Sequence, residues 1–293
     1  MSYSVFRPEE YKKRLEKSAA SGNRAIRKAI EEGEIIRLSR RWIANLDAEP
    51  DLLIAATRGC LVGCLTACKI HGLWTPTSGH PHLIYGRFGR KPRYSPELLH
   101  PSLNPDRYVG EHLTPGKSPT IVTPLIDSLE HVARYHSTET ALIVLESALY
   151  NELITQETAL AIVDKADNKK SRLLSKASAL SQSGSETRVK MFLESLRHQV
   201  KQQAYIESIG KVDILVGKSL IIECDSVAHH SSQDQMTVDR RRDMAAMHLG
   251  YQVVRLSYQQ IWKLWELTKQ ELKAILATKK HLEPPKRLAG ALF

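Results

Sequence analysis

Three carboxylates stand in and beside two neighbouring apolar runs, an arrangement that could hold a metal ion. Asp213 lies in the first run, Val212–Val216, and Glu223 and Asp225 close the second, which begins at Leu220; the glycine-containing turn between them predicts a β-hairpin. Residues two apart on a strand point to the same face, so Glu223 and Asp225 project together. Burying acids among Val, Ile and Leu costs free energy unless a cation neutralises them. The pattern therefore predicts a hard-metal site with Asp213, Glu223 and Asp225 as ligands.

The segments around the hairpin predict a mixed α/β domain. The expected elements are a helix over Glu186–His198, a strand at Gln203–Ile206, the hairpin, a helix that ends at Gly250, a strand over Tyr251–Leu256 and a closing helix over Ile261–Ala277. Glu186 opens the first helix. It is either a first-turn charge that favours the helix dipole or an additional acid that faces the metal.

Composition describes a soluble, basic chain. Its 293 residues are 42% apolar and 25% charged, as in globular proteins, and they are enough for two or three modest domains. We expect no membrane association, because no apolar run approaches the roughly 20 residues that span a bilayer and the first residues lack a secretory signal. Four cysteines without a disulfide-like spacing predict a cytoplasmic protein. The net charge of +10 favours a polyanionic partner.

The first 45 residues predict a small DNA-binding head. Two short helices, over Arg7–Lys17 and Asn23–Glu32, are expected on either side of a break at Ala20–Gly22, and two strands, over Glu34–Leu38 and Trp42–Ala44, follow. Helix, turn, helix and a basic β-wing make a winged helix, whose cations would bind phosphates. The expected DNA contacts are Arg24, Arg27 and Lys28 on the second helix and Arg37, Arg40 and Arg41 on the wing. The alternative is a solvated basic face on a helical domain.

The middle of the chain offers little recognisable chemistry. Three cysteines recur every four residues in an expected helix among small apolar residues, which favours core positions over a metal stripe. They are Cys60, Cys64 and Cys68. Three histidines near a proline-rich stretch are interpreted as structural or surface residues, with zinc as a minor alternative: His71, His80 and His82. From Pro124 to Ala177 apolar residues recur at helical intervals, which predicts helices that pack on one another.

Two stretches of the first third carry a resemblance to a known family. They are Gly33–Ala44 (GEIIRLSRRWIA) and the expected helical segment Leu52–Trp74, which contains LTACKIHGLW. In these stretches the chain resembles the AbiEi family of abortive-infection antitoxins. Arg41 stands where family members usually have a glycine at the wing turn, which alters the turn and adds a positive charge. The resemblance implies a DNA-binding head and a role in host defence or a toxin–antitoxin-like system.

A second resemblance covers residues 183–262. It rests on Glu186, Arg188, Gln203, Val212–Asp213, Ile222–Asp225, His229–His230, Asp239–Arg240, Arg242–Asp243, Gly250 and Arg255. In these residues the segment resembles the nuclease domain related to very short patch repair endonucleases, of the PD-(D/E)XK superfamily. Family members usually read E-x-D-G-x-x-H-H, and Ser226 stands here for the glycine, which would weaken activity if that position needs a positive φ. Fusion of an AbiEi-like head to this domain is a recurring arrangement.

This resemblance implies metal-dependent phosphodiester hydrolysis. Asp213 and Glu223 would ligate Mg²⁺ or Mn²⁺, which polarises the scissile phosphate and lowers the pKa of an attacking water. Asp225 stands where many superfamily members carry a lysine, so it is expected to be a further ligand or to orient the water. His229 is the expected general acid or base, since imidazole titrates near neutrality, and His230 is a weaker candidate.

The basic residues after the hairpin have two interpretations. Arg240 and Arg242 would clamp phosphates or brace the acids by bidentate pairing. The alternative is a structural role, in which these arginines form an ion-pair network with Asp213, Glu223 and Asp239 and catalyse nothing.

Together these observations predict an α/β (α+β) protein in four parts. They are a winged-helix head (1–45), an AbiEi-like middle region with a helical connector (46–177), a PD-(D/E)XK nuclease-like domain (178–280) and a tail (281–293). The expected function is that of a metal-dependent DNA endonuclease. A non-catalytic DNA-binding regulator or antitoxin with a degenerate nuclease fold is the alternative, and a nuclease acting on RNA is a third candidate. The expected partners are DNA and either a second copy of the chain or a cognate toxin or defence protein.

Overall fold

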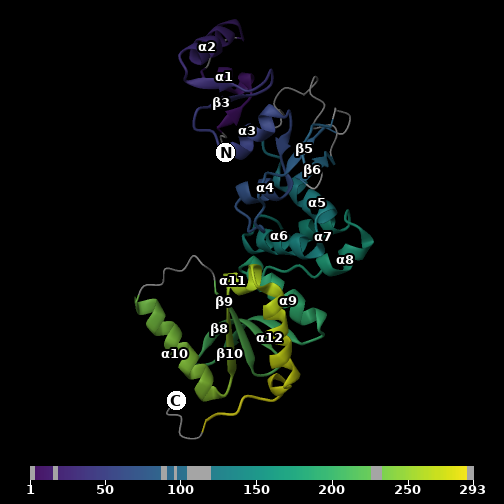
Figure 1. The fold of residues 1–293 in the computed structure, drawn as a ribbon, viewed down its shortest axis with the longest axis vertical. Helices are drawn as coiled ribbons and strands as arrows, with labels where there is room; N and C mark the ends of the chain where they lie inside the picture. The colour runs from purple at the N-terminus through teal and green to yellow at the C-terminus, as the bar shows by residue number, and fades with distance from the viewer. Residues whose placement is uncertain are drawn as a thin grey trace. The chain divides into compact units, whose positions relative to one another are not determined.

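The computed structural model describes residues 4–15, 19–86, 91–95, 98–103, 120–225 and 233–288. The chain divides into two compact units. Unit 1 comprises Met1–Val144 and Glu157–Ser175, and unit 2 comprises Leu145–Gln156 and Lys176–Phe293. Both units pack helices on small sheets, so the α+β fold predicted from the sequence is confirmed (Figure 1).

Unit 1 begins with a three-stranded antiparallel sheet in the order β1-β3-β2. The strands are β1 (Val5–Phe6), β2 (Ile35–Arg37) and β3 (Ile43–Asn45). Two helices connect β1 to β2: α1 (Pro8–Arg14) and α2 (Ala19–Glu31). The core of this head consists of Phe6, Ile26, Ala29, Ile35 and Ile43, which are all buried. The two expected helices and two expected strands are therefore present, and β1 is an addition. α1 and β2 are shorter than expected, α2 starts earlier and is longer, and β3 is shifted by one residue.

The predicted helix break at Ala20–Gly22 is wrong, because these residues lie inside α2. Gly22 is buried, and a Cβ atom at this position would come 2.5 Å from Cγ of Lys12 in α1. Glycine is thus needed for close packing of two helices rather than for a turn.

A second sheet of unit 1 has the order β4-β5-β6, with an antiparallel and then a parallel pair. Its strands are β4 (Leu61–Val62), β5 (Leu83–Tyr85) and β6 (Leu99–Pro101). The expected helical segment Leu52–Trp74 is instead α3 (Pro50–Thr57), β4 and α4 (Cys64–Ile70). The three cysteines therefore do not share one helix: Cys60 precedes β4, Cys64 opens α4 and Cys68 lies within it.

The helices expected between Pro124 and Ala177 are confirmed. They are α5 (Leu125–Tyr135), α6 (Thr138–Tyr150), α7 (Gln156–Val163) and α8 (Asn168–Leu174). α6 begins in unit 1, and its residues from Leu145 onward belong to unit 2. Every residue from Ala141 to Leu149 is buried, which explains why this stretch is apolar on all sides apart from Glu146 and Ser147.

Unit 2 is built on a four-stranded sheet in the order β10-β9-β8-β7. Its strands are β7 (Val200–Ile206), β8 (Gly210–Val216), β9 (Leu220–Asp225) and β10 (Gln252–Ser257). β7, β8 and β9 are antiparallel neighbours, so the predicted hairpin is confirmed, and β10 lies parallel to β9. A parallel neighbour needs a crossover, which the helix α10 (Gln233–Leu249) supplies.

Helices cover both faces of this sheet (Figure 1). α10 packs on one face, where Ala246 joins Ala204, Val212 and Ile221 in a buried cluster. The other face carries α9 (Gly184–Ser195), α11 (Tyr258–Trp262) and α12 (Trp265–Ala277). The single closing helix expected over Ile261–Ala277 is thus two helices. Ser257 caps α11 through a reciprocal pair of bonds with Gln260, which begins that helix earlier than expected.

The segment after α12 is anchored to unit 2. A short 3₁₀ helix covers Lys280–Leu282, and the carbonyl oxygen of His281 accepts a bond from the amide of Lys218 at 2.7 Å. The amide of Leu288 donates to the carbonyl oxygen of His248 at 2.9 Å. The residues that follow α12 therefore belong to the fold of this unit as far as Leu288.

Within the described ranges, no helix combines the length and the apolar composition that would carry it across a bilayer. All four cysteines are buried and free.

Candidate active site

The acids of the hairpin lie where β8 and β9 separate. Backbone pairing between these strands runs from Val216 opposite Leu220 to Ile214 opposite Ile222. Asp213 and Glu223 come next, and their carboxylates bond to the backbone of the facing strand. The amide of Asp213 donates to Oε2 of Glu223 at 3.2 Å, and the amide of Cys224 donates to Oδ2 of Asp213 at 2.9 Å. The structure thus brings together Asp213 and Glu223, two of the three acids that the hairpin pattern predicts as metal ligands.

α9 contributes a third carboxylate, Glu186, which is only 3% exposed. Its Oε1 accepts a bond from Oγ of Ser183 at 2.9 Å, and its Oε2 accepts bonds from the amide of Gln182 at 3.0 Å and from Nε2 of Gln203 at 2.9 Å. Ser183 also caps α9, because its Oγ accepts a hydrogen bond from the backbone amide of Glu186. Glu186 is therefore held by the helix cap and by β7, and it is more than a first-turn surface charge.

Burial and mutual repulsion raise the pKa values of two of these acids. Burial, followed by the charge of Asp213, raises the pKa of Glu223 from 4.5 to about 7. The same two causes, in the same order, raise the pKa of Glu186 from 4.5 to about 7. A divalent cation would stabilise the ionised forms of these buried, mutually repelling acids, and an all-oxygen donor set suits Mg²⁺ or Mn²⁺. The residues present therefore fit the expected hard metal.

Two arginines meet the acids of unit 2. Arg242 of α10 donates to the carbonyl oxygens of Ile209 and Lys211, and its Nη2 lies 3.7 Å from Oε1 of Glu223. Arg255 of β10 binds Asp243 at 2.8 Å and Asp225 at 3.3 Å. Asp225 is half exposed, and its cationic partner is Arg255. Arg255 was noted in the sequence only as part of the resemblance, and its pairing with Asp225 was not expected.

Among the remaining expected residues of this site, the structure describes the side chain of Arg240. Arg240 lies on α10 and is exposed. His229, His230 and Ser226 lie outside the described residues, as does the side chain of Asp239.

A buried network that sequence reasoning missed supports α9. Glu146, in the C-terminal half of α6, is completely buried and forms an ion pair with Lys190 of α9. Its Oε2 also accepts bonds from Oγ of Ser181 and Oγ1 of Thr187, each at 2.7 Å. The available signal was local: Glu146 is the only charge in the apolar run ALIVLESAL. A lone charge in such a run implies a buried partner.

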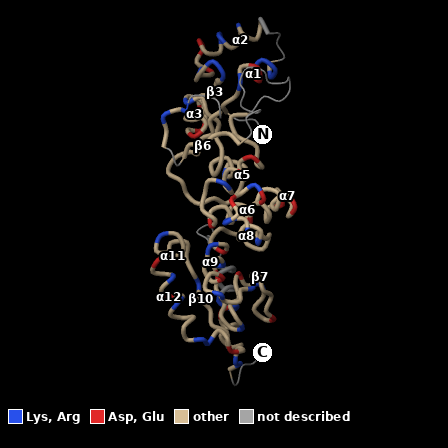
Figure 2. Tube along the Cα trace, turned by 90° about the vertical axis from the view of Figure 1, so that its right-hand side faces the viewer, with Lys and Arg blue, Asp and Glu red and all other residues tan. Residues whose placement is uncertain are grey.

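All six basic residues expected to bind DNA in the head are at least partly exposed: Arg24, Arg27, Lys28, Arg37, Arg40 and Arg41. Arg27 of α2 and Arg37 of β2 line one surface pocket of about 380 Å³ together with Asn23, Ile30 and Glu31. Figure 2 shows basic positions along α2. The second expected helix and the first strand of the expected wing therefore present cations to the same groove.

The tightest group of metal-type ligands lies elsewhere. Across the described ranges, the group whose ligand atoms all lie within 4.8 Å of one another is not the acid cluster but Cys64, His82, His100 and His136 of unit 1. Sequence reasoning treated Cys64 and His82 as separate structural residues.

Comparison with known proteins adds little. No protein-family profile and no curated protein matches the chain. Among solved structures, the chain is similar to the catalytic domain of the homing endonuclease I-Bth0305I, with 24% identity over 34% of this chain and 97% of that one and a TM-score of 0.29. A TM-score of this size does not establish a common fold, so the proposed function rests on the site.

Proposed function

We propose that the chain is a metal-dependent DNA endonuclease whose catalytic site is formed by Asp213, Glu223 and Glu186. The observation that carries the proposal is the pair of Asp213 and Glu223 at the point where two antiparallel strands separate. Arg242 forms an ion pair with Glu223 at 3.7 Å but also donates to the carbonyl oxygens of Ile209 and Lys211. Its single charge balances only part of the charge that Asp213 and Glu223 carry when both are ionised, and a metal ion would balance the rest.

The side chains have distinct proposed roles. Asp213 and Glu223 would hold Mg²⁺ or Mn²⁺, with Asp225 as a further ligand or a water-orienting group. When bound, the ion would polarise the scissile phosphate and acidify the attacking water. Glu186 has a pKa of about 7, so it can accept or return a proton near neutral pH, and Gln203 holds it in position.

Basic residues of unit 2 would hold phosphates of the DNA backbone. Arg240 is exposed on α10, and we assign it to the DNA backbone together with Arg242. His229 keeps its proposed role as general acid or base, which supplements Glu186.

The head is proposed to deliver the nuclease to DNA. Its sheet order β1-β3-β2, with α1 and α2 between β1 and β2, supports the proposal of a winged helix, in which α2 would enter the major groove. The exposed cations of α2 and of the loop between β2 and β3 support this assignment. The proposed functional parts remain 1–45 for an AbiEi-like head, 46–177 for the connector, 178–280 for a nuclease domain related to very short patch repair endonucleases and 281–293 for the tail. A role in phage defence, with a cognate partner or a second copy of the chain, belongs to the same proposal.

One observation favours a second candidate, a DNA-binding regulator that retains the fold without cleavage. Asp225 is paired with Arg255 rather than left for a metal ion. If Asp225 and Arg255 remain paired when the protein binds DNA, only two acids of the strands, Asp213 and Glu223, are left to bind a metal ion.

A cleavage assay separates the two candidates. Supercoiled plasmid, single-stranded DNA and single-stranded RNA would be incubated with Mg²⁺, with Mn²⁺ and with neither ion. We expect the wild type to nick DNA only with a metal, and Asp213→Ala and Glu223→Ala to lose cleavage while they bind DNA normally. Glu194→Ala, at an exposed position of α9, is the matched control. Wild-type-like cleavage by either site variant contradicts the assignment of the catalytic site, and DNA binding by the wild type without any cleavage favours the regulator.

A further inference from the structure

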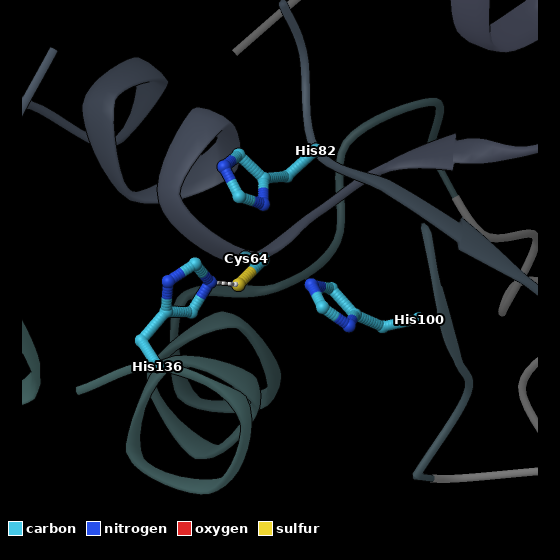
Figure 3. A group of neighbouring side chains, drawn as sticks. All are labelled: Cys64, His82, His100 and His136. Atoms are coloured by element: carbon cyan, nitrogen blue, oxygen red, sulfur yellow. Dashed lines mark hydrogen bonds between the residues drawn. The ribbon is translucent and has the colours of Figure 1, made fainter. Parts of the chain in front are cut away.

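Four separate elements of unit 1 bring one cysteine and three histidines together. Cys64 is the first residue of α4, and His82 immediately precedes β5. His100 lies in the middle of β6, and His136 immediately follows α5. Figure 3 shows the four side chains pointing toward one another, and the Sγ atom of Cys64 lies 2.9 Å from Nε2 of His136. One ligand atom from each residue fits within a group no wider than 4.8 Å.

Burial makes this cluster unusual for a set of polar side chains. Cys64 is fully buried, and His82 and His100 are only 3% and 6% exposed. The Nδ1 atom of His82 and the Nε2 atom of His100 are buried without a hydrogen-bond partner among the described residues. Buried ring nitrogens are normally paired, so these two atoms require another partner.

A neighbouring histidine shows what an ordinary core histidine looks like in this unit. His131 is also buried, but each of its ring nitrogens lies beside a backbone carbonyl oxygen, of Asp127 at 2.6 Å and of Pro101 at 3.2 Å, so whichever nitrogen carries the proton has an acceptor. The same region therefore can satisfy a buried imidazole, and it does not do so for His82 and His100.

We propose that Cys64, His82, His100 and His136 bind one zinc ion, which fastens α4, β5, β6 and α5 to one another. Imidazole nitrogen and thiolate sulfur are the ligands that zinc prefers, and four protein ligands make a closed tetrahedral site of the structural type. Ligand atoms on such an ion lie about 3.3–3.7 Å apart, so the cluster needs to contract only slightly. The contact between Cys64 and His136 opens as both atoms turn to the metal.

The proton balance of binding follows from the ligands. The thiol of Cys64 must become a thiolate, so one proton leaves the sulfur for solvent when zinc binds. The three imidazoles bind in their neutral form and release none near neutral pH. A pocket of about 670 Å³ beside the cluster, lined by the three histidines and Tyr135, gives the ion access to the site.

The local backbone already holds two of the ligands in place. The amide of Gly63 donates to the carbonyl oxygen of His82 at 3.0 Å, which ties the start of α4 to the start of β5. A Cβ atom at Gly63 would come 2.1 Å from Cγ1 of Ile84, so only glycine allows this approach. The site is thus assembled by pairing of β4 and β5 before a metal arrives.

This ion is distinct from the metal of the proposed nuclease site. The acids of unit 2 offer only oxygen atoms, which hard cations prefer, whereas this cluster offers nitrogen and sulfur. The two sites lie in different units, so each can be tested without the other.

The first experiment uses the wild-type full-length protein. It would be purified, stripped of metal with a chelator and titrated with Zn²⁺ and, separately, with Co²⁺. We expect one zinc per chain, and for cobalt the strong visible bands of a tetrahedral site together with a near-ultraviolet thiolate-to-cobalt band. Absence of stoichiometric zinc binding, or a cobalt spectrum of octahedral type without the thiolate band, overturns the proposal.

Matched variants then test the ligands. Cys64→Ala and His82→Ala should each lower zinc affinity by at least about 100-fold, because loss of even an outer partner of a ligand typically costs 10–100-fold. Cys68→Ala, one turn further along α4 and equally buried, and His80→Ala, exposed two residues before His82, should retain full affinity. Glu223→Ala should also bind zinc normally, which keeps this test separate from that of the nuclease. Equal zinc affinity in Cys64→Ala and Cys68→Ala contradicts the assignment.

Discussion

Replacement of Glu223 by glutamine should stabilise the metal-free protein in mildly alkaline solution but not in acid. Burial, and then the charge of Asp213, raise the pKa of Glu223 from 4.5 to about 7. A carboxyl group with a raised pKa binds its proton more tightly in the folded than in the unfolded chain. Its contribution to stability is therefore full below the unfolded pKa of 4.5 and is lost as the pH rises through about 7. Glutamine stays neutral throughout and escapes this loss.

The size of the effect follows from the displacement of the pKa. A change from 4.5 to about 7 corresponds to about 3 kcal/mol, at about 1.4 kcal/mol per pH unit. The side chain is only 13% exposed, so solvent screening removes little of this. Glutamine keeps an oxygen for the amide of Asp213 but makes a weaker bond, at a cost of about 1 kcal/mol. The expected net gain is about 2 kcal/mol near pH 8, with no gain near pH 5.

Urea unfolding without Mg²⁺ or Mn²⁺ would measure this difference. Trp262 and Trp265 both lie in unit 2, so tryptophan fluorescence includes a signal from the transition of interest. Wild type and Glu223→Gln would be compared at about pH 5 and about pH 8, with Glu194→Gln on the exposed side of α9 as control. A gain of equal size at both pH values, or no gain near pH 8, would refute the reasoning that repulsion and burial store free energy at this acid.

Three further predictions concern other parts of the chain. Lys190→Met should destabilise unit 2 by about 3–5 kcal/mol in urea unfolding, because Glu146 keeps a buried charge without its partner; full stability would mean that the pair contributes nothing. Charge reversal at Arg40 and Arg41 should weaken DNA binding and lower the slope of log affinity against log salt by about 0.9 for each phosphate that is no longer neutralised, and an unchanged slope would remove the wing from the interface. Calorimetric Mg²⁺ affinity should rise between about pH 6 and pH 8, because Glu223 and Glu186 must lose their protons to meet the ion, and a flat profile would argue against these acids as the site.

Much of the local structure was determined by the sequence alone. The apolar runs on either side of a glycine turn predict the hairpin of β8 and β9, and opposed positions on that hairpin place Asp213 and Glu223 together. Helical periodicity likewise predicts α5, α6 and α7, because each buries one or more faces in the unit to which it belongs. The exposure of the basic residues of the head also follows from their charge.

Only the tertiary structure decided how distant groups converge. Hydrophobic periodicity does not indicate where the pairing of two neighbouring strands ends. It therefore predicts neither the end of the β8–β9 pairing before Asp213 nor the hydrogen bond from Gln203 to Glu186. Cys64 and His136 are separated by 72 residues and meet at 2.9 Å, because α4 and α5 pack together. Spacing along the chain therefore predicts an apolar core position for Cys64. Long-range packing instead places it among three histidines, two of which have a buried ring nitrogen without a hydrogen-bond partner among the described residues.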